Sequence, residues 1–312
     1  MEGRMAAKRR SVVADYLVYF AVRLFVCVLQ ALTYSAACAV ARFLAWAAHH
    51  IDKRHRLVAQ DNLAKAFPGK YSDAEIDRLV RAVYRHFCTV LIEIVHIPRR
   101  LQPHHWKRHV CLHHPERFID AMLSGRPLLM VTGHLGNWEL GSYIIGLVGF
   151  RTYAIARPLD NPFLDDYLRG FRERTGQKLL AKHGDFEKMQ QILESGGILG
   201  TLADQDAGQR GLFVEFFGRP ASTHKAVALL AIEHRVPMLV AGTIKRGEMY
   251  HVVPGELILP EVYERSSDAV RMMTQRFTAD LEQVIRMAPE QYFWVHRRWK
   301  HQPVARGKKK AA

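Results

Sequence analysis

The pattern of apolar and polar residues separates a hydrophobic N-terminal segment from a longer part with mixed helix and strand periodicity. Residues 16–48 are almost continuously apolar, and the stretch Leu24–Ala41, between Arg23 and Arg42, approaches the ~20 apolar residues that a membrane helix needs. Basic residues flank it on both sides, so the Lys and Arg distribution gives little orientation signal. We therefore expect residues 1–50 to form a basic N-terminus and a membrane anchor. A single span and a helix in the plane of the cytoplasmic leaflet both stay open, and a pair of amphipathic core helices is the alternative.

A long amphipathic helix is expected next. Ser72 and Glu75 have the spacing of a capping box, and apolar residues recur with helical periodicity from Ile76 to Val95. We expect Pro98 to end this helix, because proline has no amide N–H and clashes with the preceding turn.

Beyond residue 126, short apolar runs alternate with helical stretches. The expected strands are 128–132, 152–156, 198–203 and 238–244, and the expected helices are 164–174, 186–195, 223–234 and 267–287. This alternation is typical of an α/β fold with a central, mostly parallel sheet flanked by helices. We expect one domain over residues 51–303 and a basic, disordered tail over 304–312.

The composition is that of a folded, basic protein. The 45 Lys+Arg against 30 Asp+Glu give a formal net charge of +15, and 49% of the residues are hydrophobic, which excludes a disordered chain. Such charge implies an acidic partner, which could be anionic lipid, nucleic acid or an acidic carrier protein. The four cysteines form no CxxC pair, which argues against a disulfide scaffold or zinc finger. The chain also lacks the GxSxG, P-loop, GxGxxG and HExxH motifs.

A candidate catalytic histidine follows the first expected strand. Ligands of α/β sheets bind at the carboxyl ends of strands, where His134 falls. On a straight helix His134 and Glu139 would point about 140° apart. Their side chains can therefore meet only if the backbone turns, as Gly133 and Gly136 permit. We expect Glu139 to orient the His134 imidazole and to stabilise its protonated form.

Other histidines are expected to be structural. His251 and Glu256 repeat the same spacing, but in a strand-like run broken by Pro254-Gly255. A second group crowds into a short segment: His104, His105, His109, Cys111, His113 and His114. Adjacent histidines point apart in a strand and no four-ligand spacing emerges, so we expect a basic surface or linker and no metal. Metal-dependent hydrolysis through this segment is a competing hypothesis.

The segment around His134, Gly-His-Leu-Gly-Asn-Trp-Glu, resembles the His-x4-acid motif of the bacterial lipid A biosynthesis acyltransferases, to which phosphatidylinositol mannoside acyltransferases are related. Further segments match the family in order: Asp61–Leu63 and Ala66–Pro68, Arg157–Pro162, Asp204–Asp206, Val214–Pro220 and Ala288–Lys300. These matches cover nearly the whole chain, although Glu215 stands where many members have proline. The resemblance implies a glycerolipid-acyltransferase-like fold.

The resemblance also implies a reaction: transfer of a fatty acyl group from an acyl thioester, typically acyl carrier protein, to a glycolipid hydroxyl. His134 would be the general base and Glu139 its partner, without a cofactor or a covalent intermediate. His296, Arg297 and Arg298 would form a cationic rim for headgroup phosphates. The full set of expected substrate-binding residues is Asn137, Arg157, Arg174, Asp204, Asp206, Arg210, His296, Arg297 and Arg298.

The expected partners are acyl carrier protein, a glycolipid acceptor and membrane lipids, and no nucleic acid. The expected location is the cytoplasmic (inner) membrane, with the catalytic domain facing the cytoplasm. The acyl chain length, the acceptor (lipid A precursor or mannosylated inositol lipid) and the donor (carrier protein or coenzyme A) stay open. A non-catalytic basic protein that binds membranes or nucleic acid is the competing class, and the absence of a nucleic-acid recognition motif argues against it.

Overall fold

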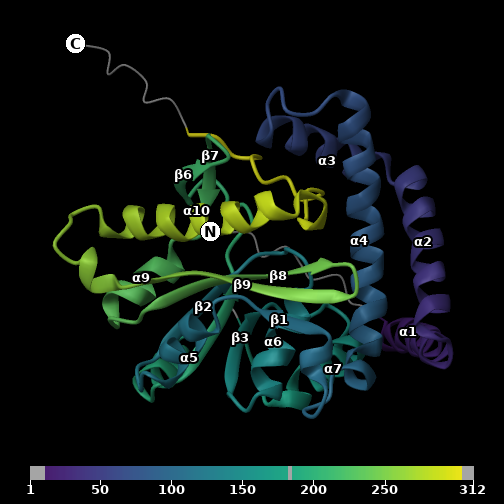
Figure 1. Ribbon diagram of the computed structural model, residues 1–312, viewed down its shortest axis with the longest axis horizontal. Coiled ribbons are helices and arrows are strands. Elements are labelled where there is room, and N and C mark those ends of the chain that lie inside the picture. Colours follow the sequence, from purple (N-terminus) through teal and green to yellow (C-terminus); the bar gives the residue numbers. More distant parts are fainter. Residues whose placement is uncertain (1–10, 182–184, 304–312) are drawn as a thin grey trace.

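A seven-stranded sheet forms the centre of the computed structural model, which describes residues 11–181 and 185–303 (Figure 1). In spatial order the strands are β1 (Val110–Leu112), β9 (Met249–Ile258), β8 (Met238–Arg246), β2 (Leu128–Thr132), β5 (Ile198–Leu202), β3 (Thr152–Ala156) and β4 (Lys178–Ala181). Neighbouring strands are parallel except β8 and β9. The predicted α/β fold with a mostly parallel sheet is confirmed. The basic residues 1–10 and the expected tail 304–312 lie outside the described residues.

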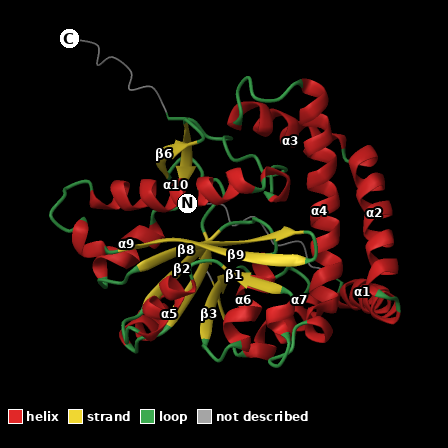
Figure 2. Ribbon diagram, viewed as in Figure 1, coloured by secondary structure: helices red, strands yellow, loops and turns green. Residues whose placement is uncertain are grey.

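Helices pack on both faces of this sheet (Figure 2). One face carries α5 (Pro115–Leu123), α6 (Trp138–Leu147) and α7 (Pro162–Arg172), and the other carries α8 (Phe186–Glu194), α9 (Ala226–Glu233) and α10 (Ala269–Met287). Because side chains alternate along a strand, Leu128 joins the core under α5 and α6, while Leu129 joins the core under α8, α9 and α10. Two apolar cores thus fix the sheet between its helices.

A short antiparallel pair that the sequence analysis did not anticipate, β6 (Leu212–Phe216) and β7 (Arg219–Thr223), stands apart from the central sheet and contacts α10. Short 3-10 turns occupy Trp106–Arg108, Glu173–Thr175, Pro260–Val262 and Pro289–Gln291.

Two expectations about prolines were wrong. Helix α4 (Asp73–Arg100) begins at the predicted capping box, but it passes through Pro98, because the Leu101 N–H still reaches the Ile97 carbonyl at 2.8 Å. Strand β9 likewise continues through Pro254. The register against β8 shifts between Leu239 and Ala241, and this irregularity accommodates a residue that cannot donate to the ladder.

The N-terminal apolar segment forms two helices rather than one. Helix α1 (Val12–Ala31) ends before Thr33, whose hydroxyl accepts the Ala36 N–H and caps α2 (Tyr34–Ile51). The expected continuous stretch Leu24–Ala41 is therefore divided at this cap. Helix α2 packs along α4, and α3 (Lys53–Ala66) follows it. Within the described part of the chain, α1 is the helix whose length and composition would allow it to cross a membrane.

Candidate active site

The loop between β2 and α6, which holds His134, turns at a position that only glycine can occupy, Gly136. Gly136 has φ +56°, and a Cβ built there would lie 1.8 Å from the Thr243 carbonyl oxygen. The Gly136 N–H donates to the Gln291 carbonyl and the Asn137 N–H to the Thr243 carbonyl, each at 2.8 Å. The loop is thus fastened to β8 and to the C-terminal segment, so its position is set by distant parts of the chain.

We expect Gly136→Ala to lower the free energy of unfolding by at least ~2 kcal/mol, because a left-handed backbone and a backbone clash coincide there. Gly69→Ala is the matched control, since Gly69 has φ +71° but nothing within 4 Å of its built Cβ. Urea denaturation of both variants measures the difference. Equal losses in the two variants would contradict this account of the loop.

His134 is paired with Asp204, which directly follows β5. The His134 Nδ1–H donates to Asp204 Oδ1 at 2.8 Å, and the His134 backbone N–H donates to Asp204 Oδ2 at 2.8 Å. Burial by itself would raise the pKa of the Asp204 carboxyl, but the bonds from His134 outweigh it and hold that pKa below its ordinary value. Asp204 therefore stays ionised and fixes the tautomer that leaves Nε2 of His134 with a lone pair.

Glu139 does not make the expected contact with His134. It lies in the first turn of α6 and forms an ion pair with Arg172 of α7, with the Arg172 Nε–H donating to Oε2 at 2.9 Å and Nη2 to Oε1. The chain turns at Gly136 before α6 begins at Trp138, so His134 faces β5 while Glu139 faces α7. The carboxylate partner of His134 is therefore Asp204 and not Glu139. Asp204 is distant from His134 in the sequence, but it follows the strand that pairs with β2.

Asn137, expected to bind substrate, is buried and serves as the N-cap of α6. Its Oδ1 accepts the Leu140 N–H at 3.0 Å, and its Nδ2 donates to Glu93 of α4 at 2.9 Å. Glu93 also pairs with Lys245 of β8 at 2.8 Å. Burial alone would lower the pKa of Lys245, but Glu93 raises it above its ordinary value. This network joins α4, β8 and the His134 loop, so the role of Asn137 in the structure is to hold the loop.

The C-terminal segment closes the other side of the pair. The Phe293 N–H donates to the His134 carbonyl at 3.0 Å, and the Tyr292 hydroxyl donates to the Asp204 carbonyl at 3.4 Å. Asn62 of α3 in turn donates to the Trp294 carbonyl at 2.6 Å. Residues 61–68 and 288–300, the two segments that resemble the family, therefore pack together and hold His134 and Asp204 in position.

The expected cationic rim is only partly present. Arg298 is 2% exposed, and its guanidinium donates to the Ser222 carbonyl at 2.5 Å and to the Thr223 hydroxyl at 2.7 Å, so it holds β7 rather than a ligand. His296 accepts the Asp206 N–H on Nε2 at 3.0 Å, and burial lowers its pKa, so it is neutral there. Arg297 is exposed.

Asp206 is held inside the fold. Its Oδ2 accepts from His301 Nδ1 at 2.6 Å and from the Gly208 N–H at 3.1 Å. The remaining expected arginines lie on the surface. Arg157 pairs with Asp160 at 3.4 Å, and Arg174 and Arg210 are exposed. No hydrogen bond described in the structure joins these three arginines to His134.

An apolar cavity that was not predicted from the sequence lies beside His134. Its volume is about 590 Å³, within the range of small-ligand pockets, and it lies between the sheet and helices α5 and α6. Trp138 lines it, and the Trp138 ring centroid is 5.2 Å from that of His134. Thr132, the last residue of β2, also lines it. One residue in the sequence could have indicated this cavity. Gly200 lies in the buried strand β5 and has no side chain to fill the space beside it.

Comparison with known proteins gives concordant matches. The family model described as bacterial lipid A biosynthesis acyltransferase matches residues 4–301. A lipid A biosynthesis acyltransferase of Haemophilus influenzae is 24% identical over 251 residues, covering 79% of this chain and 76% of that protein. The lipid A biosynthesis lauroyltransferase of Escherichia coli is 29% identical over 195 residues, covering 60% of this chain and 61% of the relative. A phosphatidylinositol mannoside acyltransferase of Mycobacterium tuberculosis is 25% identical, covering 58% and 57%.

Proposed function

The chain belongs to the bacterial lipid A biosynthesis acyltransferase family, and we propose that it transfers a fatty acyl group from an acyl thioester to a hydroxyl of a lipid A precursor or a similar glycolipid. The observation that carries this proposal is the position of the His134–Asp204 pair beside an apolar cavity. An imidazole with a free Nε2 supplies a base for a hydroxyl, and the cavity suits a hydrocarbon chain.

The reaction follows from this arrangement. His134 Nε2 removes the proton of the acceptor hydroxyl as its oxygen attacks the thioester carbonyl carbon, and Asp204 stabilises the imidazolium that forms. The C–S bond then breaks, and the leaving thiolate takes the proton from His134. The acceptor gains an ester and the donor is released as a free thiol, so no cofactor and no covalent enzyme intermediate are needed.

The decisive experiment incubates the purified protein with acyl thioesters and glycolipid acceptors and identifies the products by mass spectrometry. We expect acyl carrier protein to be the preferred donor, because the chain has a formal net charge of +15 and an acidic carrier would be attracted to it. A lipid A precursor and a mannosylated inositol lipid are offered in parallel, since relatives named for each are similar to this chain. Absence of any ester product from all acceptors would refute the proposal.

The cavity should set the length of the transferred chain. Gly200 lines it, and a Cβ built there meets only the Tyr153 carbonyl oxygen, at 3.7 Å, so a side chain fits. We expect Gly200→Leu to shift the preferred acyl donor to shorter chains, measured as kcat/KM across a thioester series. Gly170→Leu, at an exposed position of α7 with nothing within 4 Å, is the control and should keep the original preference.

Helix α1 supports attachment to a membrane. One stripe of its surface is buried or half-buried against the domain, while the rest is exposed and largely apolar. The docked stripe runs the full length of the helix: Asp15, Tyr19, Val22, Arg23, Val26, Leu29 and Gln30. Polar bonds fasten both ends, since Asn161 donates to the Asp15 carbonyl at 2.8 Å and Arg99 donates to the Gln30 carbonyl at 2.5 Å.

The contacts of α1 favour an orientation in the plane of the membrane. The helix packs against α7, and Arg23 lies over the Tyr167 ring at 4.4 Å. Helix α7 also carries Asp165, Asp166 and Arg169, and charged side chains are costly in hydrocarbon. A spanning α1 would have to carry α7 into the bilayer or break these contacts. We therefore infer that α1 lies at the interface with its apolar face in the lipid.

Depth measurements distinguish the two orientations. A fluorescent amino acid is placed at position 13, 20 or 28, and its quenching by lipids labelled at different depths is measured in vesicles containing anionic lipid. An in-plane helix predicts similar, shallow depths at all three positions, because the helix axis is parallel to the surface. A helix of this length that spans the bilayer would place position 20 near the middle and the other two near opposite surfaces, which would contradict the inference.

A further inference from the structure

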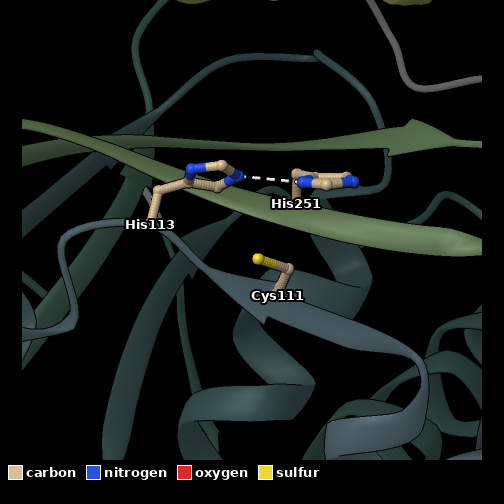
Figure 3. A group of neighbouring side chains, drawn as sticks. All are labelled: Cys111, His113 and His251. Carbon is tan, nitrogen blue, oxygen red and sulfur yellow. Dashed lines mark hydrogen bonds between the residues drawn. The ribbon is translucent and has the colours of Figure 1, made fainter.

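A group of metal-binding side chains lies outside the proposed active site. Cys111, His113 and His251 each offer one ligand atom, and these atoms lie within 4.8 Å of one another (Figure 3). His113 Nε2 and His251 Nδ1 are 2.8 Å apart and point toward each other, and Cys111 lies beside them. All three residues are half-buried. The sequence predicted no metal at residues 104–114, because no four-ligand spacing emerges there, and it predicted a structural role for His251.

The sheet brings the third ligand to the other two. Strands β1 and β9 are parallel, with Cys111 opposite His251 and Leu112 opposite Val252. Cys111 and His113 are two residues apart on β1 and its continuation, so they project from the same face of the sheet. The His113 N–H donates to the Val252 carbonyl at 3.0 Å, which extends the pairing past the end of β1. Three ligands therefore come from two hydrogen-bonded segments and need no flexible loop.

We propose that Cys111, His113 and His251 form a zinc-binding site with solvent as the fourth ligand. One thiolate and two imidazoles are the borderline-soft donors that Zn²⁺ prefers, and three protein ligands leave one tetrahedral position open. The half-buried position of the group gives water access to that position.

Binding requires side-chain rotations that bring the three ligand atoms, now within 4.8 Å of one another, to the distances of a tetrahedral site. Tetrahedral Zn²⁺ with ordinary Zn–S and Zn–N distances needs ligand atoms about 3.3–3.6 Å apart. The two imidazole nitrogens would separate by about 0.5 Å from their present 2.8 Å, a change that side-chain rotation supplies. Binding requires a lone pair on both facing nitrogens, so the remaining ring protons sit on the far nitrogens. The Cys111 thiol proton is released to solvent.

The proposed site connects to the apolar cavity through β1. Val110 and Leu112 alternate with the ligands along this strand, and both line the cavity, as does Val252 of β9. The ligands and the cavity-lining residues therefore occupy opposite faces of the same two strands. Bound zinc would link β1, an edge strand of only three residues, to β9. This link would stabilise one wall of the cavity. This inference is independent of the proposed acyl transfer.

The test is metal binding by the full-length protein in detergent, without a histidine tag. The metal-free protein is titrated with Zn²⁺ and, separately, with Co²⁺, whose absorption reports tetrahedral geometry and thiolate ligation. We expect stoichiometric binding, one ion per chain, a thiolate-to-cobalt charge-transfer band, and a higher Tm with Zn²⁺. Cys111→Ser should abolish the charge-transfer band, and His251→Gln should abolish stoichiometric binding.

Matched controls separate this site from general effects. Cys27→Ser removes an exposed thiol of α1, and His114→Gln removes the histidine adjacent to the site, which pairs with Glu116. Both should bind zinc like the wild type. Circular dichroism of each metal-free variant shows whether it is folded. If Cys111→Ser or His251→Gln does not fold, His113→Gln takes its place as a ligand variant. Absence of stoichiometric binding by the wild type, or undiminished binding by folded ligand variants, would overturn the assignment.

Discussion

His134→Gln is expected to lower kcat for acyl transfer by about 10²- to 10⁴-fold, the usual contribution of a general base. Glutamine is close to histidine in size and can still accept or donate a hydrogen bond toward Asp204, but it cannot take a proton from a hydroxyl. The measurement is the rate of ester formation with a saturating acyl thioester and a glycolipid acceptor. KM for either substrate should change little, because the imidazole acts on the reacting hydroxyl and not on the acyl chain.

Stability and binding controls accompany this variant. The glutamine amide can still donate to the Asp204 carboxylate that His134 bonds, so the variant should stay folded, and its thermal transition reports the stability that is lost with the His134–Asp204 pair. Association with vesicles, which we attribute to α1, should be unchanged. A folded His134→Gln protein that retains wild-type kcat would remove the imidazole from the reaction and refute the proposed mechanism.

Asp204→Asn should reduce kcat nearly as much, by about 10²- to 10³-fold, because an amide in place of the carboxylate no longer favours the His134 tautomer with a free Nε2 lone pair. It also cannot stabilise the imidazolium. The steady-state rate as a function of pH is the informative readout, because Asp204 acts on the reaction through the charge that it places beside His134. A merely structural role of Asp204 would change stability and leave that profile unmoved.

Acid stability gives a second measure of the same pair. The pKa of Asp204 is lowered in the folded protein from its ordinary value of 3.8, so its bonds with His134 stabilise the fold above that value. This contribution is lost as the pH falls from about 4 through the lowered folded value. Asp204→Asn should therefore show a smaller loss of stability between neutral and acidic pH than the wild type.

Glu139→Gln is the contrasting variant, since Glu139 is the acid that the sequence motif suggests. It is ion-paired with Arg172, whose side chain is 22% exposed, so its loss should destabilise the contact between α6 and α7 by about 2–4 kcal/mol. Its pH–rate profile should keep the wild-type shape. A shifted profile in Glu139→Gln and an unchanged one in Asp204→Asn would reverse the assignment of the partner.

Several parts of the fold were readable in the sequence because they depend on local periodicity. The strands at Leu128, Thr152, Ile198 and Met238 begin where the apolar runs predicted. The capping box at Ser72 was likewise a local signal, confirmed by the bond from the Ser72 N–H to Glu75 at 2.8 Å. The predictions that a single proline ends a helix or interrupts a strand were wrong. Proline removes only one hydrogen-bond donor, and the neighbouring hydrogen bonds are enough for α4 and β9 to continue beyond it.

The sequence by itself determined the fold class, the family and the position of His134 at the end of a buried strand, since periodicity and motif order are properties of the chain. Only the tertiary structure decided that Asp204, seventy residues from His134, is its partner. It also decided that Arg298 is buried and that His251 joins Cys111. In each case the fold places segments distant in the chain side by side, and hydrogen bonds between such segments leave no trace in residue spacing.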